Sequence, residues 1–261
     1  MKSIIKSFRT LAILSTIAFL SSCASKQDVI YFQDEAITSA IENQNSNFEL
    51  HYKSDDLLTI NVSALDPVVA MPFNLQAVST NRSVIDAQGS LKIQTYLIDV
   101  NGNIEFPVLG TLKLGGLSRS EANKYLKTKL SEYIVNPIVN IRLANFTISV
   151  LGEVKNPGTY TIDDERISLT QALGLAGDLT IFGRRDNVFL IREVNGKKKY
   201  SKFDLTSINV VNSPNYYLTQ NDVIYIEPNN AKIRASSYNQ NNGVIISAVG
   251  TLATIIAILI K

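Results

Sequence analysis

Few side chains in this sequence are arranged for acid–base or metal chemistry. Asp55 and Asp56 are adjacent carboxylates, which could share the roles of general acid and base, and His51 is the only histidine. Catalytic carboxylates and metal ions both need further groups at defined positions, and no partner of that kind is recognisable beside these three residues. A short carboxylate in a turn commonly bonds the backbone that follows it. We therefore interpret Asp55 and Asp56 as turn residues and His51 as a packing or surface residue.

Two charged runs also have a simpler explanation than catalysis or binding. The acidic run 163–165, followed by Arg166, lacks the histidine or additional carboxylates of a metal site. The three lysines at 197–199 are too few for a nucleic-acid groove, and the formal net charge of the whole chain is only +2. The sequence therefore predicts a protein that is not an enzyme, that has no metal or cofactor, and that has no nucleic-acid partner.

Cys23 is the only cysteine, which excludes an intrachain disulfide and a cysteine metal cluster. It follows basic residues at positions 2, 6 and 9 and an apolar stretch at 11–20, the order that is typical of a signal peptide. The run Leu-Ser-Ser-Cys that ends at Cys23 resembles a bacterial lipobox. This resemblance implies that residues 1–22 are removed and that Cys23 becomes the lipidated first residue. The alternative is a plain signal peptide followed by an ordinary buried cysteine.

Residues 98–153 read as a small unit of strands and one helix. Asn101 and Gly102 lie between apolar runs and predict a hairpin turn in which both residues have positive φ. Ser118 and Glu121 form a capping box at the start of a helix, whose apolar residues recur at helical spacing as far as 134. The dipeptide Asn-Pro at 136–137 ends that helix, and residues 138–150 alternate as one strand.

The flanking segments extend this α+β pattern. Residues 58–62 alternate as a strand, 66–89 lack clean periodicity, and 91–98 read as a further strand. A second unit then covers 151–228, with strands at 159–162, 188–192, 198–203 and 222–228. Ser168 and Gln171 predict a capped helix over 169–176, which ends at Gly177 in a left-handed cap position.

The first unit resembles the polysaccharide export domain of the Wza-type outer-membrane lipoproteins. The resemblance rests on a long run of matching positions: Asp99, Gly102, Ile104, Phe106, Pro107, Leu109, Gly110, Leu112, Leu114, Gly116, Leu117, Ser118, Asn136, Pro137, Val139 and Ile141. Before the strand at 58–62 the family usually has a Gly-Pro-Gly-Asp turn, of which only Asp56 is kept here. The resemblance alone implies that the substrate is a polysaccharide, because no residue chemistry in the sequence indicates one.

The second unit resembles an SLBB (soluble-ligand-binding β-grasp) domain. The matching positions are Val150, Gly152, Glu153, Val154, Pro157, Gly158, Tyr160, Ala176, Gly177, Asp178, Leu179, Asp222, Ile224, Ile226 and Pro228. The family often carries two such domains, and this chain has room for one. Tyr216 and Tyr217 could stack on sugar rings, although tyrosines at a strand end more commonly pack in the core.

The C-terminal segment is unusually apolar. Residues 243–260 contain no charge over 18 positions and would form a helix ~27 Å long, close to the roughly 30 Å of a bilayer core. We therefore predict a membrane-spanning helix. Small or polar residues follow one face of it and would either pack tightly against another helix or, as the family resemblance implies, line a pore. These residues are Gly243, Ser247, Gly250, Thr251 and Thr254.

The sequence thus predicts an α+β protein made of two small domains and a C-terminal transmembrane helix. Its expected segments are a signal peptide (1–22), a lipidated tether (23–47), a polysaccharide export domain (48–149), an SLBB domain (150–228), a polar linker (229–242) and the helix (243–261). The resemblance implies an outer-membrane lipoprotein with a periplasmic body. Such a protein would form a homo-oligomeric ring and pass capsule or exopolysaccharide, with an inner-membrane co-polymerase or tyrosine-kinase-type partner. The alternative is a periplasmic lipoprotein that binds glycan or acts as a scaffold without transporting it.

Overall fold

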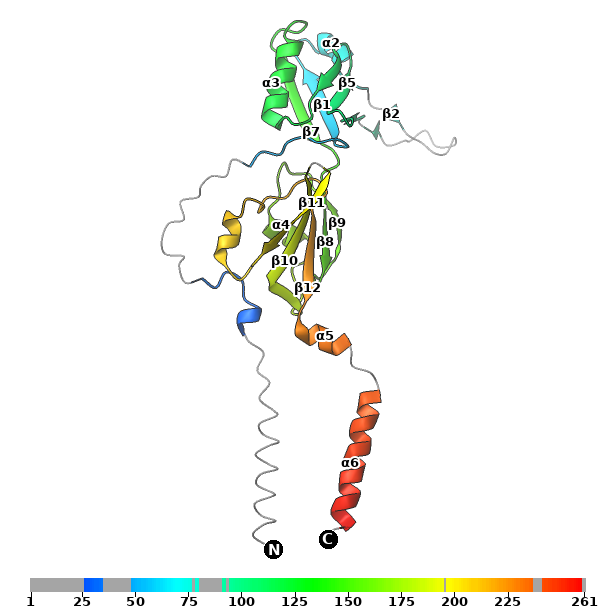
Figure 1. Ribbon diagram of the computed structural model, residues 1–261. Coiled ribbons are helices and arrows are strands. Elements are labelled where there is room, and N and C mark those ends of the chain that lie inside the picture. Colours follow the sequence, from blue (N-terminus) through cyan, green and yellow to red (C-terminus); the bar gives the residue numbers. More distant parts are fainter. Residues whose placement is uncertain are drawn as a thin grey trace, which may run out of the picture.

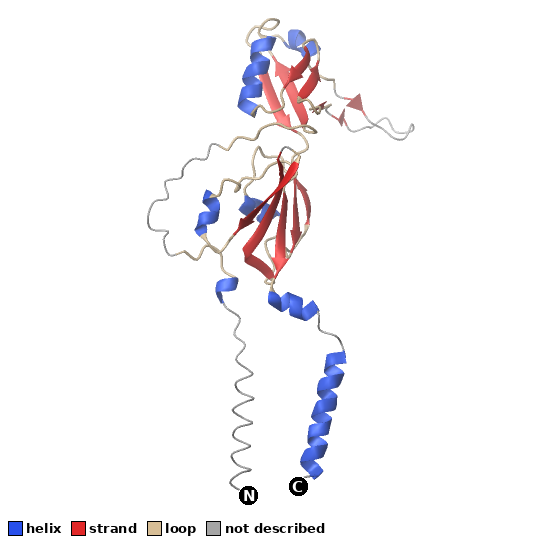
Figure 2. Cartoon of the chain, in the orientation of Figure 1, coloured by secondary structure: helices blue, strands red, loops and turns tan. Residues whose placement is uncertain are grey.

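A computed structural model describes residues 26–34, 48–76, 78–79, 91–92, 94–194, 196–236 and 241–259. The described strands gather in two units, as Figure 1 and Figure 2 show. The described part of the first unit lies within 48–143, and the second covers 147–228. Sequence reasoning predicted this α+β content in two units.

The first unit contains one α-helix of three turns and several short strands. The elements are β1 (Leu57–Ser63), α2 (Pro67–Ala70), η2 (Met71–Phe73), β2 (Val78–Ser79), β3 (Leu91–Lys92), β4 (Tyr96–Leu97), β5 (Asn103–Phe106), β6 (Gly110–Lys113), α3 (Arg119–Leu130) and β7 (Ile138–Leu143). The main sheet has the order β4-β1-β7 with antiparallel pairs, while β5 pairs with β6 and β2 with β3. Apolar residues of the strands and of α3, including Leu58, Ile141 and Leu126, form one buried core.

Local sequence signals explain where α3 begins. The Ser118 hydroxyl oxygen accepts a hydrogen bond from the backbone of Glu121, and the Glu121 carboxylate accepts one from the backbone of Ser118, so the predicted capping box is confirmed. These hydrogen bonds to the carboxylate lower the pKa of Glu121. The carbonyl of Gly102 accepts bonds from Leu114 and Gly115, and Gly115 has no room for a Cβ because it would lie 2.6 Å from the Cα of Gly102.

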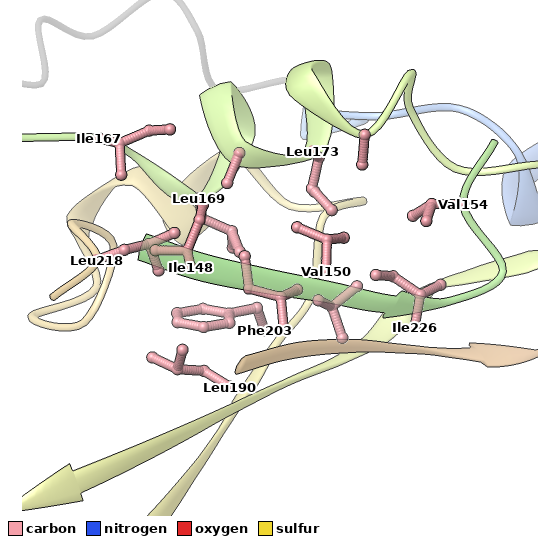
Figure 3. Close-up of a cluster of buried hydrophobic side chains, with 14 of the residues drawn as sticks. Ile148, Val150, Val154, Ile167, Leu169, Leu173, Leu190, Phe203, Leu218 and Ile226 are labelled. Atoms are coloured by element: carbon pink, nitrogen blue, oxygen red, sulfur yellow. The ribbon is translucent and has the colours of Figure 1, made fainter. Parts of the chain in front are cut away.

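The second unit is a five-stranded sheet with a helix on one face. Its elements are β8 (Thr147–Gly152), β9 (Gly158–Thr161), α4 (Leu169–Leu175), β10 (Gly183–Val194), β11 (Lys197–Phe203), η3 (Ile208–Asn212) and β12 (Val223–Pro228). The strand order is β11-β10-β12-β8-β9, and only the β12–β8 pair is parallel. Figure 3 shows Leu169 and Leu173 of α4 directed toward Ile148 and Val150 of β8, within the second buried core. The capping box at Ser168 and Gln171 is confirmed.

One predicted strand and one predicted turn differ from the structure. Residues 138–150 form two strands, β7 and β8, which belong to different sheets because the chain leaves the first unit at 144–146. The turn at 99–102 has a positive φ at Gly102 only, since the Asp99 carboxylate accepts bonds from the backbone of Asn101 and Asn103 and stabilises a different turn. The hairpin in this region is instead formed by β5 and β6, with Val108 at φ 66° in its turn.

The predicted membrane-spanning helix is also wrong. Within the described residues, no helix combines the length and the apolar character that crossing a membrane requires. After α5 (Asn230–Ser236), the chain forms α6 (Asn241–Leu259), which has 19 residues and begins with two asparagines.

Candidate functional site

The carboxylates that could have been catalytic have structural roles. Asp55 adopts a φ of 70° in a turn, and Asp56 accepts a hydrogen bond from the backbone of Lys53 at 2.8 Å. Asp56 is buried, and burial raises the pKa of its carboxyl. His51 lies on the surface, with its Nδ1 3.0 Å from the carbonyl oxygen of Glu49. Within the described ranges, no group of three or more His, Cys, Asp or Glu residues is placed to hold a metal ion.

The segment at 26–34, which we call the N-terminal strap, is bound along the second unit. It begins with η1 (Lys26–Asp28) and continues beside the chain that follows β11. The backbone of Phe32 donates to Leu205 at 3.2 Å and that of Gln33 donates to Thr206 at 2.6 Å. The Asp34 carboxylate then accepts from the hydroxyl of Ser207 and the backbone of Ile208, at 2.6 and 2.8 Å.

Tyr31 fixes the strap through its side chain. Its hydroxyl donates to the Asp178 carboxylate at 2.5 Å, and the Arg185 guanidinium lies over its ring at 5.2 Å from the ring centroid. Burial, and then the hydrogen bond to Asp178, raise the pKa of Tyr31 well above its ordinary value. Arg185 is itself buried and donates to the carbonyls of Gly183 and Thr180. Tyr31 is therefore held through both its hydroxyl and its ring.

The strap limits where a group attached at Cys23 can lie. Cys23 is outside the described residues, but only two residues separate it from Lys26, the first residue of η1. Three residues span roughly 11 Å when fully extended. In Figure 1, η1 and α5 lie at the end of the second unit that is farther from the first unit. The strap therefore begins at that end of the second unit.

Asn145 connects the two units. Its side-chain oxygen accepts from the backbone of Leu57 at 2.9 Å, and its amide donates to the carbonyl of Asp55 at 3.0 Å. Gln220 of the second unit donates to the carbonyl of Asn145 at 2.5 Å and accepts from the backbone of Thr147 at 2.7 Å. These bonds leave little freedom of rotation at the connection between β7 and β8.

Side chains on both sides of this connection add further contacts. Arg119 of α3 forms an ion pair with Glu165, so part of the charged run 163–166 is not simply solvated. The Phe48 ring stacks on Tyr217 with centroids 5.3 Å apart, while Arg166 lies over Tyr217 at 5.1 Å. Tyr217 is therefore occupied by contacts within the chain and does not offer a free platform for a sugar.

A buried ion pair supports the loop that carries Tyr217 and Gln220. Asp222 is fully buried and pairs with Arg192 of β10 at 2.6 Å. The Arg192 guanidinium also donates to the side chain of Asn215 and the carbonyl of Tyr217. Breaking a buried pair leaves an uncompensated charge, so these contacts hold the loop firmly.

The residues predicted to face a pore or another helix lie on α6. Thr251 donates to the carbonyl of Ser247 and Thr254 donates to that of Gly250, both at 2.8 Å. Their hydroxyl hydrogens are thus used within the helix itself. Sequence analysis predicts a pore or packing role for these two threonines and for Gly243, Ser247 and Gly250. That role requires a membrane-spanning helix, which the described residues do not contain.

Sequence reasoning predicts residues 23–47 only as a lipidated tether and does not predict the contacts of the strap. The aromatic pair Tyr31-Phe32 in a polar segment is the signal that could have indicated docking. Sequence reasoning also predicts one strand over 138–150, although the buried positions change phase between Ile141 and Phe146, which could have indicated the break at Asn145.

Comparison with known proteins assigns both units to families. Residues 44–144 match the family described as polysaccharide biosynthesis/export protein, and residues 147–226 match the SLBB domain. The proteins similar to this chain include two that are named EPS I polysaccharide export outer membrane protein EpsA. The one from Ralstonia solanacearum is 24% identical over 166 residues, which cover 62% of this chain and 44% of that protein. The one from Ralstonia nicotianae is 24% identical over 165 residues, covering 62% and 43%. The matched part of this chain thus spans less than half the length of these relatives.

Proposed function

We propose that this chain is an outer-membrane component of an exopolysaccharide or capsule export apparatus, because residues 44–144 match the polysaccharide biosynthesis/export family and residues 147–226 match the SLBB domain. The observation that carries the proposal is the presence of both domains, in this order, in a chain related to proteins named for polysaccharide export. Export of a polymer needs a hydrated path and an assembly around it, and it needs no nucleophile or acid–base pair. The structural roles of Asp55, Asp56 and His51 agree with such a task.

A lipid anchor at Cys23 would hold this protein in the outer membrane. Several acyl chains bind a membrane firmly because each buried CH₂ contributes roughly 0.8 kcal/mol. The strap would transmit this anchorage to the SLBB domain, since it binds that domain directly after the lipidated residue. The polysaccharide export domain would then project into the periplasm, toward an inner-membrane co-polymerase or tyrosine-kinase-type partner.

Assembly of several copies completes the proposal. Identical subunits that contact one another head to tail close into a ring when the rotation between them permits it. A ring of this kind surrounds a channel that a sugar polymer can follow. The subunit body proposed here has one export domain and one SLBB domain, preceded by a signal peptide (1–22) and a lipidated segment (23–47).

Particle images of the full chain, extracted in mild detergent, test this proposal. We expect closed rings with a central opening, and a native mass that is a multiple of the lipidated subunit. A monomer that binds a soluble polysaccharide would contradict export and would favour the alternative, a periplasmic glycan-binding lipoprotein. The Cys23→Ala chain serves as a control, because it should lose labelling with radioactive palmitate and leave the membrane fraction.

A further inference from the structure

The five-stranded sheet of the SLBB domain has two edges of different chemistry. In the described part of the chain, β11 pairs only with β10 and β9 pairs only with β8, so each presents one row of backbone groups on its outer side. Such edges are templates for pairing with another chain. Ile162 donates to the carbonyl of Phe146, and in an antiparallel ladder the inward and outward directions alternate. The backbone groups of Thr159 and Thr161 therefore point outward.

The two edges carry opposite charge. Lys197, Lys198 and Lys199 on β11 are exposed and form no ion pair with any residue that the structure describes. The other edge strand, β9, has no cation and leads into the exposed acids Asp163 and Asp164, which are also without an ion pair among the described residues. The next two charged residues are engaged within their own chain, Glu165 with Arg119 and Arg166 with Tyr217.

The register of the sheet places these charges on the same side of one row of residues. Tyr200 is opposite Ile191, Ile191 is opposite Val223, Val223 is beside Ser149, and Ser149 is opposite Thr159. Tyr200 and Thr159 thus end one row that crosses all five strands. Because β11 and β9 run in opposite directions, the lysines at 197–199 and the acids at 163–164 lie on the same side of that row.

We infer that the β11 edge of one copy packs antiparallel against the β9 edge of the next copy, with Tyr200 opposite Thr159. In this register the lysine end of β11 adjoins the acidic end of β9, because Lys197 is one residue from the position opposite Asp163. Two β11 edges would bring six lysines together, and this repulsion disfavours a two-fold dimer through the same strand. Contacting edges that lie at equal height favour a closed ring over a rising helix. The inference rests on the proposed export function only for the expectation that the copies form a ring.

Disulfide cross-linking of the full chain in membranes tests this contact. Residues opposite one another in an antiparallel pair have Cα atoms about 4.5–5.5 Å apart, within the range that a disulfide bridges. A chain with both Tyr200→Cys and Thr159→Cys should give, on mild oxidation, a ladder of covalent oligomers beyond the dimer. Each single substitution should give no more linkage than the unsubstituted chain. The matched control is Tyr225→Cys with Thr159→Cys, because Tyr225 is exposed on the central strand β12 and should not link.

A charge exchange provides the second arm. Glutamate at 197, 198 and 199 should reduce the native mass in detergent to that of the monomer, and adding Asp163→Lys and Asp164→Lys should restore it. Replacing Lys124 and Lys127 of α3 by glutamate should leave the mass unchanged. Dimers formed by Tyr200→Cys alone, or no ladder from the paired cysteines, would overturn the inference. If rings form but the paired cysteines do not cross-link, this contact is wrong and the proposed export function is unaffected. If export continues in cells that lack the protein, the proposed function is wrong and the contact is unaffected.

Discussion

The hydroxyl of Tyr31 donates to the carboxylate of Asp178, a residue 147 positions later in the sequence, at 2.5 Å. This bond joins the segment that follows the proposed lipid anchor to the turn that ends α4. An anchor attached to a flexible tether would only keep the protein near the membrane. An anchor attached to the strap would also fix the direction in which the SLBB domain faces.

Tyr31→Ala should release the strap. The substitution removes the hydrogen bond to Asp178 and the ring contact with Arg185, and it exposes a buried guanidinium. We expect a loss of about 2–4 kcal/mol in the free energy of unfolding, by analogy with other truncations of buried aromatic residues. Limited proteolysis near residue 30 should become faster. Tyr225→Ala, at an exposed position on β12, is the control, and equal proteolysis of the two variants would contradict the docking of the strap.

Asn145→Ala should loosen the connection between the two units. The asparagine side chain bonds the backbone of Leu57 and of Asp55, and each lost bond of a partly buried group costs about 1–3 kcal/mol. Calorimetry should resolve two unfolding transitions for this variant, against one for the unsubstituted chain. Asn140→Ala on the exposed side of β7 should keep the single transition. A single transition in both variants would show that other contacts couple the units.

Gly102→Ala should destabilise the first unit more than Gly116→Ala does. Both glycines have positive φ, at 83° and 88°, so both variants incur the cost of the left-handed conformation, about 1 kcal/mol. A Cβ added at Gly102 would lie 3.2 Å from the Cα of Gly115. A Cβ added at Gly116 would have no atom within 4 Å. Urea unfolding should show a lower midpoint for Gly102→Ala. Equal midpoints would mean that φ alone governs the two sites.

Stability should fall in alkaline solution because of buried tyrosines. Burial raises the pKa of Tyr52 to about 12, against about 10 in the unfolded chain. An acid with a raised pKa in the folded state contributes its full stability below pH 10, and that contribution is lost as the pH rises toward 12. The free energy of unfolding should therefore decrease by about 1.4 kcal/mol per pH unit for this residue. Tyr52→Phe should show a shallower decrease between pH 10 and 12, and an unchanged slope would contradict the raised pKa.

Local signals in the sequence were sufficient for many elements of the fold. The capping boxes at Ser118 and Ser168 specify both main helices of the folded body, since a side chain and a backbone amide three residues apart satisfy each other. The left-handed cap at Gly177, with φ of 76°, was predictable for the same reason. The strands of the SLBB domain were predictable from alternation and from the turns between them.

Contacts between distant segments were not predictable in this way. The division of 138–150 into β7 and β8 depends on Asn145 bonding two separate parts of the chain. The alternation changes phase there, from buried Val139 and Ile141 to buried Ile148 and Val150, but it does not show which segments Asn145 bonds. The docking of Tyr31 depends on Asp178 and Arg185, which no local pattern relates to it.

The partition of polysaccharide in a strain that lacks this protein tests the central claim most directly. Surface and released polymer should be lost while polymer synthesis continues inside the cell, and the unsubstituted chain supplied in trans should restore export. Chains with Cys23→Ala should restore it poorly. Normal amounts of polymer outside a strain without the protein would contradict the proposed role in export.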